Sequence, residues 1–583
     1  MEENKTESKN FIEDIIEADI EAGLHGGRVH TRFPPEPNGY LHIGHAKAIC
    51  LNFGLAAKYN GKTNLRFDDT NPSTEETAYV DAIKKDIKWL GFDWEDREYY
   101  ASDYFPQLYQ FAHDLIDKGL AYVDDLSPEE MAAQKGSPTE PGVNSPNRDR
   151  SIEDNKRLFT EMREGKHEDG SLVLRAKIDM ASPNLLMRDP LIYRIKKETH
   201  HRTGDEWPIY PMYDFAHGQS DSIEQITHSL CSLEFRHHRD VYDWLIASLG
   251  IFPSKQREFS RMNVEYMMTS KRKLLKLVNE GIVNGWDDPR MPTISGLRRR
   301  GYPAVAIRTF CDKVGMTKRE NLIDPALLDF CVREELNKTT DRVNVVMDPI
   351  KMIITNYPDG QVEQLQALNN PEDEVPSYRE LPFSKELYIE RTDFMVDPPK
   401  KFFRMGPGRD VRLKFAYILH CEDYKANAET GEIEEVYCTY YPDSKSGEDT
   451  SGIKAKGTLH WVSVDHAIPI TVNLYDRLFT DPTPDAHEGK DFTEFLNPES
   501  IRQVKALAEP HIKSAKPGDC FQFMRTGYFA VDTESTVDDI IINRTVTLKD
   551  AWKKKQSKGG GQQKQKQKQN YNQHQQKKDS SNK

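Results

Sequence analysis

The sequence predicts an α/β fold in its first part and β-barrels or sandwiches in its last part. From His30 to Gly119, short apolar strands alternate with helical patterns, which is typical of α/β domains. A stretch rich in Pro, Gly and Asn at 137–146 indicates a loop in an inserted domain. From Asp341 onward, apolar runs are separated by turn residues, which favours barrels or sandwiches.

The elements of the first part can be placed in order along the chain. An amphipathic stretch at 11–24 comes first. The hydrophobic pattern predicts strands at residues 29–33 and 64–67 and a helix at residues 79–90. The apolar residues at 209–215 then mark a return to the first fold after the insertion.

Helical patterns dominate residues 261–338, which include the basic segment 297–300. The β-rich runs that follow are 343–347, 351–355, 411–419, 458–464 and 470–474. We therefore divide the chain into an N-terminal extension (1–25), the first half of the α/β domain (26–120), an insertion (121–210), the second half of the α/β domain (211–260), a helical connecting domain (261–340), β-barrel domains (341–552) and a basic tail (553–583).

The composition permits a large, soluble, multidomain enzyme. At 583 residues the chain has room for several domains of roughly 150 residues each. We find no apolar run of about 18 residues, and residues 1–10 are charged and polar, so we expect a cytoplasmic protein without a membrane partner. The seven cysteines contain no C-x-x-C pair, which argues against a disulfide framework or a zinc ribbon, and we expect no resident metal site.

The formal net charge of −14 averages over unlike segments. Residues 553–583 contain ten lysines and one acid, Asp579, so the tail carries +9 and the rest about −23. The tail has too few apolar residues to fold, and we expect it to be disordered. It is either an electrostatic tether for RNA or a solubilising extension. Because screening makes local fields decisive, net charge does not exclude a nucleic-acid partner.

A turn rich in Pro and Gly, 34–46, joins the first predicted strand to a helix. The N-terminus of a helix offers free N–H groups and a partial positive charge, both suited to phosphate oxygens. His42 and His45 lie on one face of the first turn, and Gly44 allows close approach of the backbone. The two histidines can therefore donate hydrogen bonds to a phosphate whose charge grows during adenylyl transfer. Alone, this short motif is more often a capped helix with two surface histidines.

A second motif and the flanking sequence decide between these interpretations. His42-Ile43-Gly44-His45, together with Met268-Thr269-Ser270-Lys271-Arg272, resembles the paired signatures of class I aminoacyl-tRNA synthetases. Within that class, the chain resembles the glutaminyl-tRNA synthetase family from about residue 26 to 552. The segments that carry this closer resemblance are 34–39, 66–72, 210–215, 227–231 and 285–301.

The resemblance implies an α/β Rossmann-type catalytic domain with an inserted acceptor-binding domain, a helical connecting domain and C-terminal β-barrel anticodon-binding domains. It implies that L-glutamine attacks the α-phosphate of ATP, with Mg²⁺ bridging the phosphates, to give glutaminyl-adenylate and pyrophosphate. The 2′-hydroxyl of the terminal adenosine of tRNA(Gln) then takes the acyl group. The family also leads us to expect that activation needs tRNA, and nothing in the sequence demands more than a monomer.

The resemblance also assigns roles to individual residues. His42 and His45 hold the α-phosphate region, and Lys271, on a mobile loop, brings positive charge to the departing phosphates. The expected ATP-binding residues are Glu36, Pro37, Asn38, His42, Ile43, Gly44, His45, Ala46, Lys47, Ala48, Ser232, Arg261, Met262, Thr269, Ser270 and Lys271.

For glutamine, the resemblance implies that Asp68 pairs with the substrate ammonium group, that Tyr213 and a water held by Gln256 read the side-chain amide, and that Arg32 lies near the same pocket. Without the family context, Asp68 could belong to a turn with a helix cap, and Tyr213 could be a core aromatic residue.

For the anticodon, the resemblance points to Arg342, Arg412 and Gln522. The chain departs from the family pattern at Thr269, where Met is usual, and at Lys414, where Arg is frequent in bacteria. Two departures affect the acceptor end: Pro138 replaces an apolar wedge, and Arg236-His237-His238 replaces a usual Gln-Asp pair.

Three alternatives remain open. A synthetase specific for glutamate is the nearest, but Pro37-Asn38 and Met212 favour glutamine. A small-molecule nucleotidyltransferase would need neither the second signature nor the β-rich half. An RNA-binding regulator with a degenerate synthetase domain would not need the intact His42 and Lys271. Charging of tRNA with glutamine or with glutamate distinguishes them.

Overall fold

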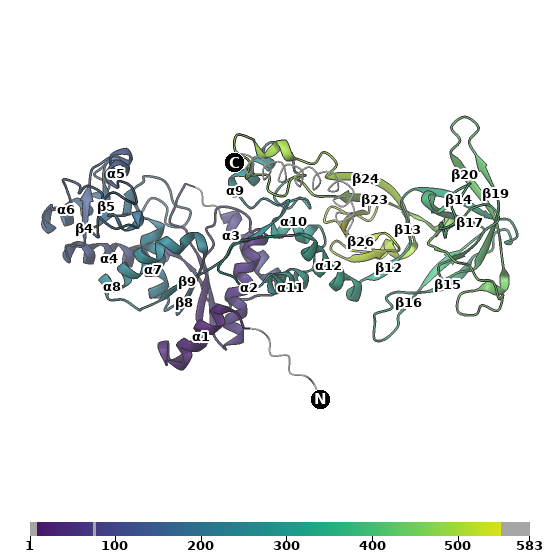
Figure 1. The fold of residues 1–583 in the computed structure, drawn as a ribbon, viewed down its shortest axis with the longest axis horizontal. Coiled ribbons are helices and arrows are strands. Elements are labelled where there is room, and N and C mark those ends of the chain that lie inside the picture. The colour runs from purple at the N-terminus through teal and green to yellow at the C-terminus, as the bar shows by residue number, and fades with distance from the viewer. Residues whose placement is uncertain (1–8, 74–76, 550–583) are drawn as a thin grey trace, which may run out of the picture. The chain divides into compact units, whose positions relative to one another are not determined.

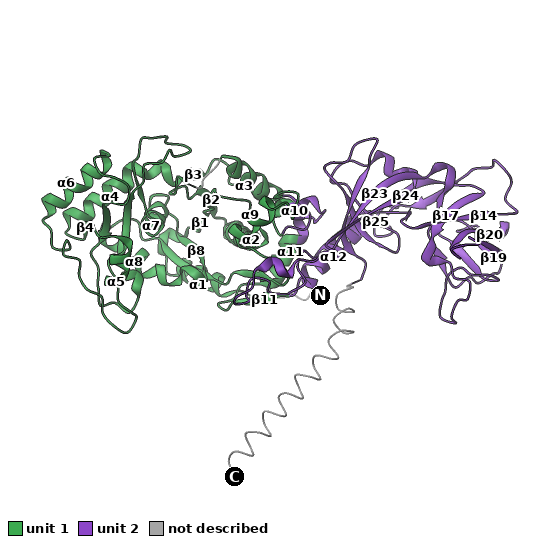
Figure 2. Ribbon diagram, turned by 90° about the horizontal axis from the view of Figure 1, so that it is seen from above, with its two compact units in different colours: residues 1–286, 292–295, 307–323 green, residues 287–291, 296–306, 324–583 purple. Residues whose placement is uncertain are grey.

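The computed structural model describes residues 9–73 and 77–549, so the predicted disordered tail at 553–583 lies outside the described residues. The chain divides into two compact units, coloured green and purple in Figure 2. The first unit comprises 1–286, 292–295 and 307–323, and the second comprises 287–291, 296–306 and 324–583. In the described part of the chain, no helix has both the length and the apolar character needed to cross a membrane.

The first unit is built on parallel strands (Figure 1). Strands β1 (His30–Phe33), β2 (Lys62–Phe67) and β3 (Glu98–Tyr100) pair in that order, and helices α2 (Ile43–Lys58) and α3 (Thr77–Trp89) connect them. A second parallel pair is formed by β8 (His228–Ser232) and β9 (Lys255–Phe259). The two groups meet where the backbone N–H of Thr227 donates to the carbonyl of His30 at 2.9 Å. The predicted α/β fold is confirmed.

An antiparallel four-stranded sheet is inserted between β3 and β8. Its strands are β4 (Ala121–Asp124), β5 (Val173–Ala176), β6 (Leu191–Ile195) and β7 (Ile209–Pro211). The helices of this region are α4 (Phe105–Asp117), α5 (Pro128–Gln134), α6 (Ile152–Arg163), α7 (Tyr213–Ile223) and α8 (Arg239–Leu249). Large aromatic side chains, including Phe105, Phe159 and Tyr193, fill the core between them.

Helix α1 (Phe11–Glu21) belongs to the core of the first unit. Asn10 caps it by accepting hydrogen bonds from the backbone N–H groups of Ile12 and Glu13. Its buried side chains, Ile12 and Ile16, pack with Leu51 and Leu55 of α2. Residues 11–21 of the amphipathic stretch predicted at 11–24 therefore form a packed helix.

Four helices and a short parallel strand pair occupy the predicted helical region. They are α9 (Lys271–Asn279), α10 (Ile294–Arg299), α11 (Ala304–Val314), α12 (Ala326–Thr339), β10 (Met262–Val264) and β11 (Asn321–Ile323). The helical prediction for 261–338 is thus confirmed, with the β10–β11 pair as an addition.

The second unit contains two seven-stranded sheets. The first has the order β12-β25-β26-β27-β23-β24-β13, and the second has the order β21-β18-β19-β20-β14-β17-β22. In the first sheet the two end strands, β12 (Asp341–Val343) and β13 (Val345–Val346), follow each other in the chain. The ends of the second sheet, β21 (Thr458–Leu459) and β22 (Val462–Ser463), do the same. Because one short segment supplies both ends of each sheet, both sheets are barrel-like, as predicted.

The remaining strands of the two sheets are β14 (Pro349–Ile354), β17 (Glu386–Glu390), β18 (Asp410–Leu413), β19 (Ile418–Ala426), β20 (Ile433–Tyr440), β23 (Ile468–Tyr475), β24 (Ile501–Ala508), β25 (Cys520–Phe523), β26 (Gly527–Val531) and β27 (Ile541–Thr547). A hairpin of β15 (Glu363–Leu368) and β16 (Tyr378–Phe383) is separate. The apolar run 411–419 is not one strand, because the chain turns between β18 and β19 with Phe415 at a φ of 65°. Periodicity alone did not reveal that turn.

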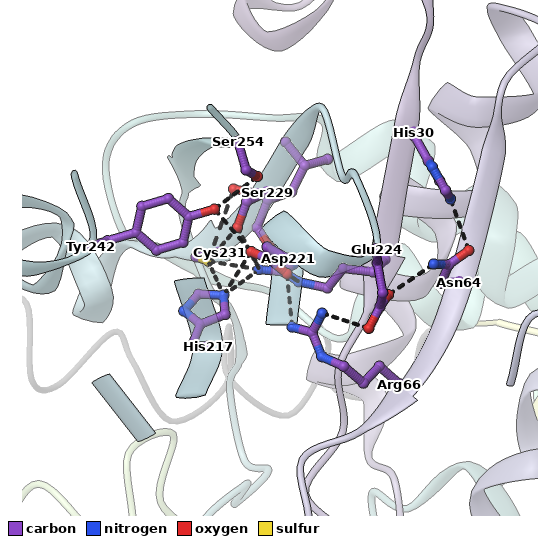
Figure 3. Close-up of polar contacts among 12 residues, drawn as sticks. His30, Asn64, Arg66, His217, Asp221, Glu224, Ser229, Cys231, Tyr242 and Ser254 are labelled. Atoms are coloured by element: carbon purple, nitrogen blue, oxygen red, sulfur yellow. Dashed lines mark hydrogen bonds and ion pairs between the residues drawn. The ribbon is translucent and has the colours of Figure 1, made fainter. Parts of the chain in front are cut away.

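A buried charge network joins β1, β2, α7 and β8 (Figure 3). Asp221 of α7 accepts from Arg32 Nε at 3.1 Å and from Arg66 Nη2 at 2.7 Å, and all three side chains are almost fully buried. Figure 3 shows Arg66 and Glu224 on one side of Asp221, and His217 and Tyr242 on the other. Although burial opposes ionisation, the two guanidinium groups hold the pKa of Asp221 well below its usual value.

Removal of Asp221 should therefore destabilise the first unit. Asp221→Ala leaves two buried guanidinium groups without their shared carboxylate, which should cost about 3–5 kcal/mol and lower the melting temperature by roughly 5–10 °C. Differential scanning calorimetry measures the shift. Asp243→Ala, at a half-exposed carboxylate 3.9 Å from Lys255, is the matched control and should shift it by about 1 °C or less. Equal shifts for the two variants would contradict this account.

Candidate active site

A cavity of about 370 Å³ lies at the carboxyl ends of β1 and β8, beside the N-terminus of α2. In open α/β sheets this edge is where ligands bind. The sequence-predicted residues that line it are Glu36, His42, Gly44, His45, Ala48, Tyr213, Ser232, Arg261, Met262 and Thr269. Residues from segments more than 200 positions apart in the sequence thus meet in one pocket.

The rings of His42 and His45 stack at the start of α2, with their centroids 3.8 Å apart. His42 Nδ1 accepts from the backbone N–H of Gly44, and His45 Nδ1 accepts from the backbone N–H of His42, each at 3.1 Å. Burial, with the nearby charges of Arg261 and Lys271, lowers the pKa of His45 to about 4, and burial also lowers that of His42. Both imidazoles are therefore neutral at pH 7.

The tautomer of each ring follows from these contacts. A neutral imidazole whose Nδ1 accepts a hydrogen bond carries its proton on Nε2. His42 and His45 consequently each present an Nε2–H donor. Gly44 is required for this arrangement, because a Cβ at that position would lie 2.9 Å from His42 Cε1.

The two sequence signatures contact each other directly. Lys271 Nζ donates to the side-chain oxygen of Asn38. Its aliphatic chain crosses Gly39, where an added Cβ would collide with Lys271 Cε. Lys271 also begins helix α9, directly after Ser270. The second signature therefore lies beside the Pro- and Gly-rich turn of the first.

Several predicted ATP residues do not line the cavity with their side chains. Ile43 and Ala46 are fully buried on the core side of α2. Lys47 is also buried, and its Nζ donates to the carbonyl of Ser260 at 3.0 Å. Pro37 is buried in the turn. Any contact that these four residues make with a nucleotide would have to come from the backbone.

Of the four predicted glutamine residues, Tyr213 belongs to the lining of the cavity, whereas Arg32, Asp68 and Gln256 lie outside that lining. Tyr213 lines the cavity, and burial raises the pKa of its phenol well above the usual value, so it stays protonated. Asp68 follows the carboxyl end of β2, and burial raises its pKa to about 6, against the opposing charge of Arg66. Thr70 Oγ1 donates to Asp68 Oδ1 at 3.1 Å.

Arg32 and Gln256 are held by the protein itself. Besides Asp221, Arg32 donates to the carbonyl of Leu230 at 2.8 Å and to Ser229 Oγ at 2.6 Å. Gln256 Nε2 donates to the carbonyl of Phe235 at 3.0 Å. Gln256 Oε1, in contrast, is buried without a hydrogen-bond partner among the described residues. That oxygen is an acceptor for a water or a ligand.

Sequence reasoning missed His217, Asp221 and Cys231 as parts of this site. His217 Nε2 lies 2.6 Å from Arg32 Nη2 and 3.3 Å from Asp221 Oδ2, and Cys231 lines the cavity. Although burial opposes it, the charges of Arg32 and His217 lower the pKa of Cys231. One available signal was the spacing of Tyr213, His217 and Asp221, because residues four apart share one face of a helix.

Of the predicted anticodon residues, Arg342 and Gln522 are neighbours. They face each other across β12 and β25, and Gln522 Nε2 donates to the hydroxyl of Tyr528 at 2.9 Å. Arg342 Nη2 donates to Asn337 Oδ1 at 3.0 Å. Tyr528 and Asn337 are polar members of this group that the sequence did not suggest.

Arg412 belongs to the other barrel-like sheet, on β18. Its Nη1 donates to the carbonyl of Ser444 at 2.8 Å, and its Nη2 pairs with Asp449. The three predicted anticodon residues therefore form two separate groups.

Within residues 9–73 and 77–549, one group of side chains has the composition of a metal site: Asp69, His200 and His201. His200 Nδ1 accepts from the backbone N–H groups of Arg202 and Thr203, so its proton is on Nε2, which donates to the carbonyl of Asp69 at 2.7 Å. A metal would need that nitrogen unprotonated. Through the hydrogen bond from His200 to the carbonyl of Asp69, the group instead holds the backbone directly after Asp68.

Three family models match the chain. The model described as "tRNA synthetases class I (E and Q), catalytic domain" matches residues 28–338. Two models described as "tRNA synthetases class I (E and Q), anti-codon binding domain" match residues 340–441 and 458–532. The β-rich region thus corresponds to anticodon-binding domains, as predicted.

Curated relatives match almost end to end. A glutamine–tRNA ligase of Rhodopirellula baltica is 55% identical over 556 residues, which cover 95% of this chain and 92% of the relative. A glutamine–tRNA ligase of Proteus mirabilis is 52% identical over 560 residues, which cover 96% and 100%. Among solved structures, a glutamate-tRNA synthetase from Elizabethkingia anophelis matches with a TM-score of 0.40 and 18% identity, covering 54% of this chain and 71% of that chain. The chain therefore belongs to the glutamine–tRNA ligases of the class I (E and Q) tRNA synthetase family.

Proposed function

We propose that this chain activates L-glutamine with ATP and transfers it to the 2′-hydroxyl of the terminal adenosine of tRNA(Gln). The observation that carries the proposal is the pair of Nε2–H donors of His42 and His45 in a cavity shared with Tyr213. This pocket can hold a phosphate at one end and an amino-acid side chain at the other. The strand order supports a Rossmann-type catalytic domain, and the division into seven segments stays a prediction.

In the first step, an oxygen of the glutamine carboxylate attacks the α-phosphorus of ATP, and pyrophosphate leaves. The phosphate oxygens gain negative charge as the new bond forms. Neutral imidazole N–H groups of His42 and His45 stabilise that charge without proton transfer, and they need no reorganisation because the backbone already fixes their Nδ1 atoms. Lys271, beside the same turn, supplies positive charge toward the departing pyrophosphate.

Mg²⁺ would enter with ATP and neutralise phosphate charge. The exposed carboxylate of Glu36 lines the cavity, and the other carboxylate there, Glu234, is paired with Arg261 at 3.0 Å. This donor set fits an ion that is bound mainly by phosphates and waters and by few protein ligands.

Selection of glutamine rests on the opposite end of the pocket. The Asp68 carboxylate pairs with the substrate ammonium group, and the Tyr213 phenol and the partnerless Gln256 Oε1 read the side-chain amide directly or through water. The amide NH₂ can donate to Gln256 Oε1, whereas the carboxylate of glutamate has no hydrogen to donate. A site built to bond the amide rejects glutamate because buried polar groups are then left unpaired.

In the second step, the terminal 2′-hydroxyl attacks the carbonyl carbon of glutaminyl-adenylate, and AMP leaves. We propose that the insertion presents the acceptor end, and that Arg342 with Gln522 in one barrel and Arg412 in the other read anticodon bases. Planar guanidinium and amide groups suit both the edges and the faces of unstacked bases.

Charging assays test the proposed function. Purified total tRNA, ATP and Mg²⁺ are incubated with labelled glutamine or, separately, with labelled glutamate. We expect charging with glutamine alone, because Tyr213 and Gln256 would hydrogen-bond the side-chain amide while Asp68 pairs with the ammonium group. Charging with glutamate would overturn the account of the amide pocket. Charging with neither would favour an RNA-binding role.

Glutamine binding should depend on the ionisation of Asp68. Its carboxyl is ionised above its raised pKa of about 6, so the KM for glutamine should rise as the pH falls below that value. Asp68→Asn should raise the KM for glutamine about 100-fold and remove this acid limb, with little change in the KM for ATP. Steady-state aminoacylation from pH 5 to 8 measures both effects. Asp96→Asn, at a 95% exposed carboxylate, is the control and should behave as the wild type.

The histidine pair should act as hydrogen-bond donors in the transition state. His45→Ala should lower kcat for pyrophosphate exchange, measured with tRNA(Gln) present, about 10²- to 10³-fold with little change in the KM for glutamine. His45→Gln places an amide N–H near the position of Nε2 and should retain more activity than His45→Ala. A role of His45 in proton transfer would instead be indicated if His45→Gln were as slow as His45→Ala.

A further inference from the structure

The loop region that follows β8 touches two of the proposed glutamine-reading residues. It forms a 3₁₀ helix, η4 (Leu233–His238), which leads directly into α8. The ring of Phe235 lies 5.2 Å from the ring of Tyr213, measured between centroids. The carbonyl of Phe235 accepts from Gln256 Nε2 at 3.0 Å. Phe235 of η4 therefore contacts both residues, and Gln256 Nε2 also donates to Glu258 Oε1 at 3.1 Å.

One polar contact ties η4 to the helix that carries Tyr213. His238 Nδ1 lies 2.5 Å from Asp214 Oδ1, and the two side chains are 30% and 23% exposed. Asp214 is in the first turn of α7, directly after Tyr213, and α7 has no side-chain cap at its N-terminus. A carboxylate in that turn is favoured by the helix dipole, and here it also accepts a hydrogen bond from η4.

The contacts form a closed ring. Tyr213 and Asp214 are consecutive residues, and Asp214 accepts a hydrogen bond from His238. The centroid of the His238 ring lies 5.5 Å from that of the Phe235 ring, and Phe235 in turn packs on Tyr213. In addition, Asn184 of the insertion donates to the carbonyl of His237 at 2.8 Å. The hydrogen bond between His238 and Asp214 is the polar contact that closes the ring on the α7 side.

We propose that His238 and Asp214 are a positioning pair for glutamine selection: they hold η4 against the first turn of α7 and so fix the separation between Tyr213 and Gln256. This inference rests on the proposed function. His238 touches no reacting atom, so it acts through Tyr213 and Gln256. The acid that raises the pKa of the His238 imidazole is Asp214, its hydrogen-bond partner, against the opposing effect of burial.

The test compares substitutions that move the donor atom. His238→Asn places its Nδ2–H near the position of Nδ1, whereas His238→Gln places its N–H one bond farther out, near Nε2. We expect His238→Ala and His238→Gln to raise the KM for glutamine about 10-fold, which is the size of one charge-assisted hydrogen bond, with the KM for ATP unchanged. His238→Asn should stay within about 3-fold of the wild type.

A matched control is available elsewhere in the chain. His420 Nδ1 and Asp410 Oδ1, in the other unit, are 2.8 Å apart with similar exposure, so His420→Ala removes the same kind of pair. It should leave the KM for glutamine unchanged. All variants are assayed by steady-state aminoacylation of tRNA(Gln), after thermal unfolding has shown that they are folded.

The outcomes separate the two proposals. A wild type that does not charge tRNA with glutamine overturns the proposed function. A wild type that charges, with His238→Ala or His238→Gln at an unchanged KM for glutamine, overturns the positioning role alone. That role is also wrong if His238→Asn is as impaired as His238→Gln, or if the KM for ATP rises in parallel. If His238→Ala does not fold, the comparison of His238→Asn with His238→Gln decides.

Discussion

The arrangement of the active site depends on one buried carboxylate. Asp221 binds Arg32 of β1 and Arg66 of β2, and it also accepts from the hydroxyl of Tyr242 on α8 at 3.1 Å. Guanidinium groups cannot lose their charge at neutral pH, so without Asp221 Arg32 would lose its buried carboxylate partner, while Arg66 would keep Glu224 at 2.9 Å. This requirement fixes α7 against the sheet. Because Tyr213 begins α7 and Asp68 follows β2, the same carboxylate links the two elements that carry these residues.

The candidate site residues lie in two electrostatic environments. At the start of α2, burial keeps His42 and His45 neutral, and backbone N–H groups donate to their Nδ1 atoms, which leaves one Nε2–H donor on each ring. Asp68, which follows β2 and is outside the lining of the cavity, is a carboxyl group whose ionisation depends on pH near 6. Neutral donors suit a phosphate that gains charge during the reaction, while a carboxylate suits an ammonium group that is charged throughout. Under the proposed function, the two substrates would therefore meet different protonation environments.

Local patterns predicted much of the fold. The strands at 29–33 and 64–67, the helix at 79–90 and the β-rich second half were all found, because alternation and apolar runs reflect which face of an element is buried. The apolar run 411–419 was read as one segment although the chain turns at Phe415, since a non-glycine residue with positive φ leaves no mark in hydrophobicity. The pattern at 11–24 indicated an amphipathic segment, but it could not show that Ile12 and Ile16 pack with Leu51 and Leu55 of α2.

The sequence by itself determined the two signature motifs, the α/β and barrel-like architecture, and the residues of the motifs that line the cavity, such as His42, His45 and Thr269. Only the tertiary structure decided that Lys47 faces Ser260, that His217 and Asp221 both contact Arg32, and that His238 reaches Asp214. The physical reason is that motifs record short-range spacing. Hydrogen bonds, protonation and burial are instead set by residues that are far apart in the chain and meet only when it folds.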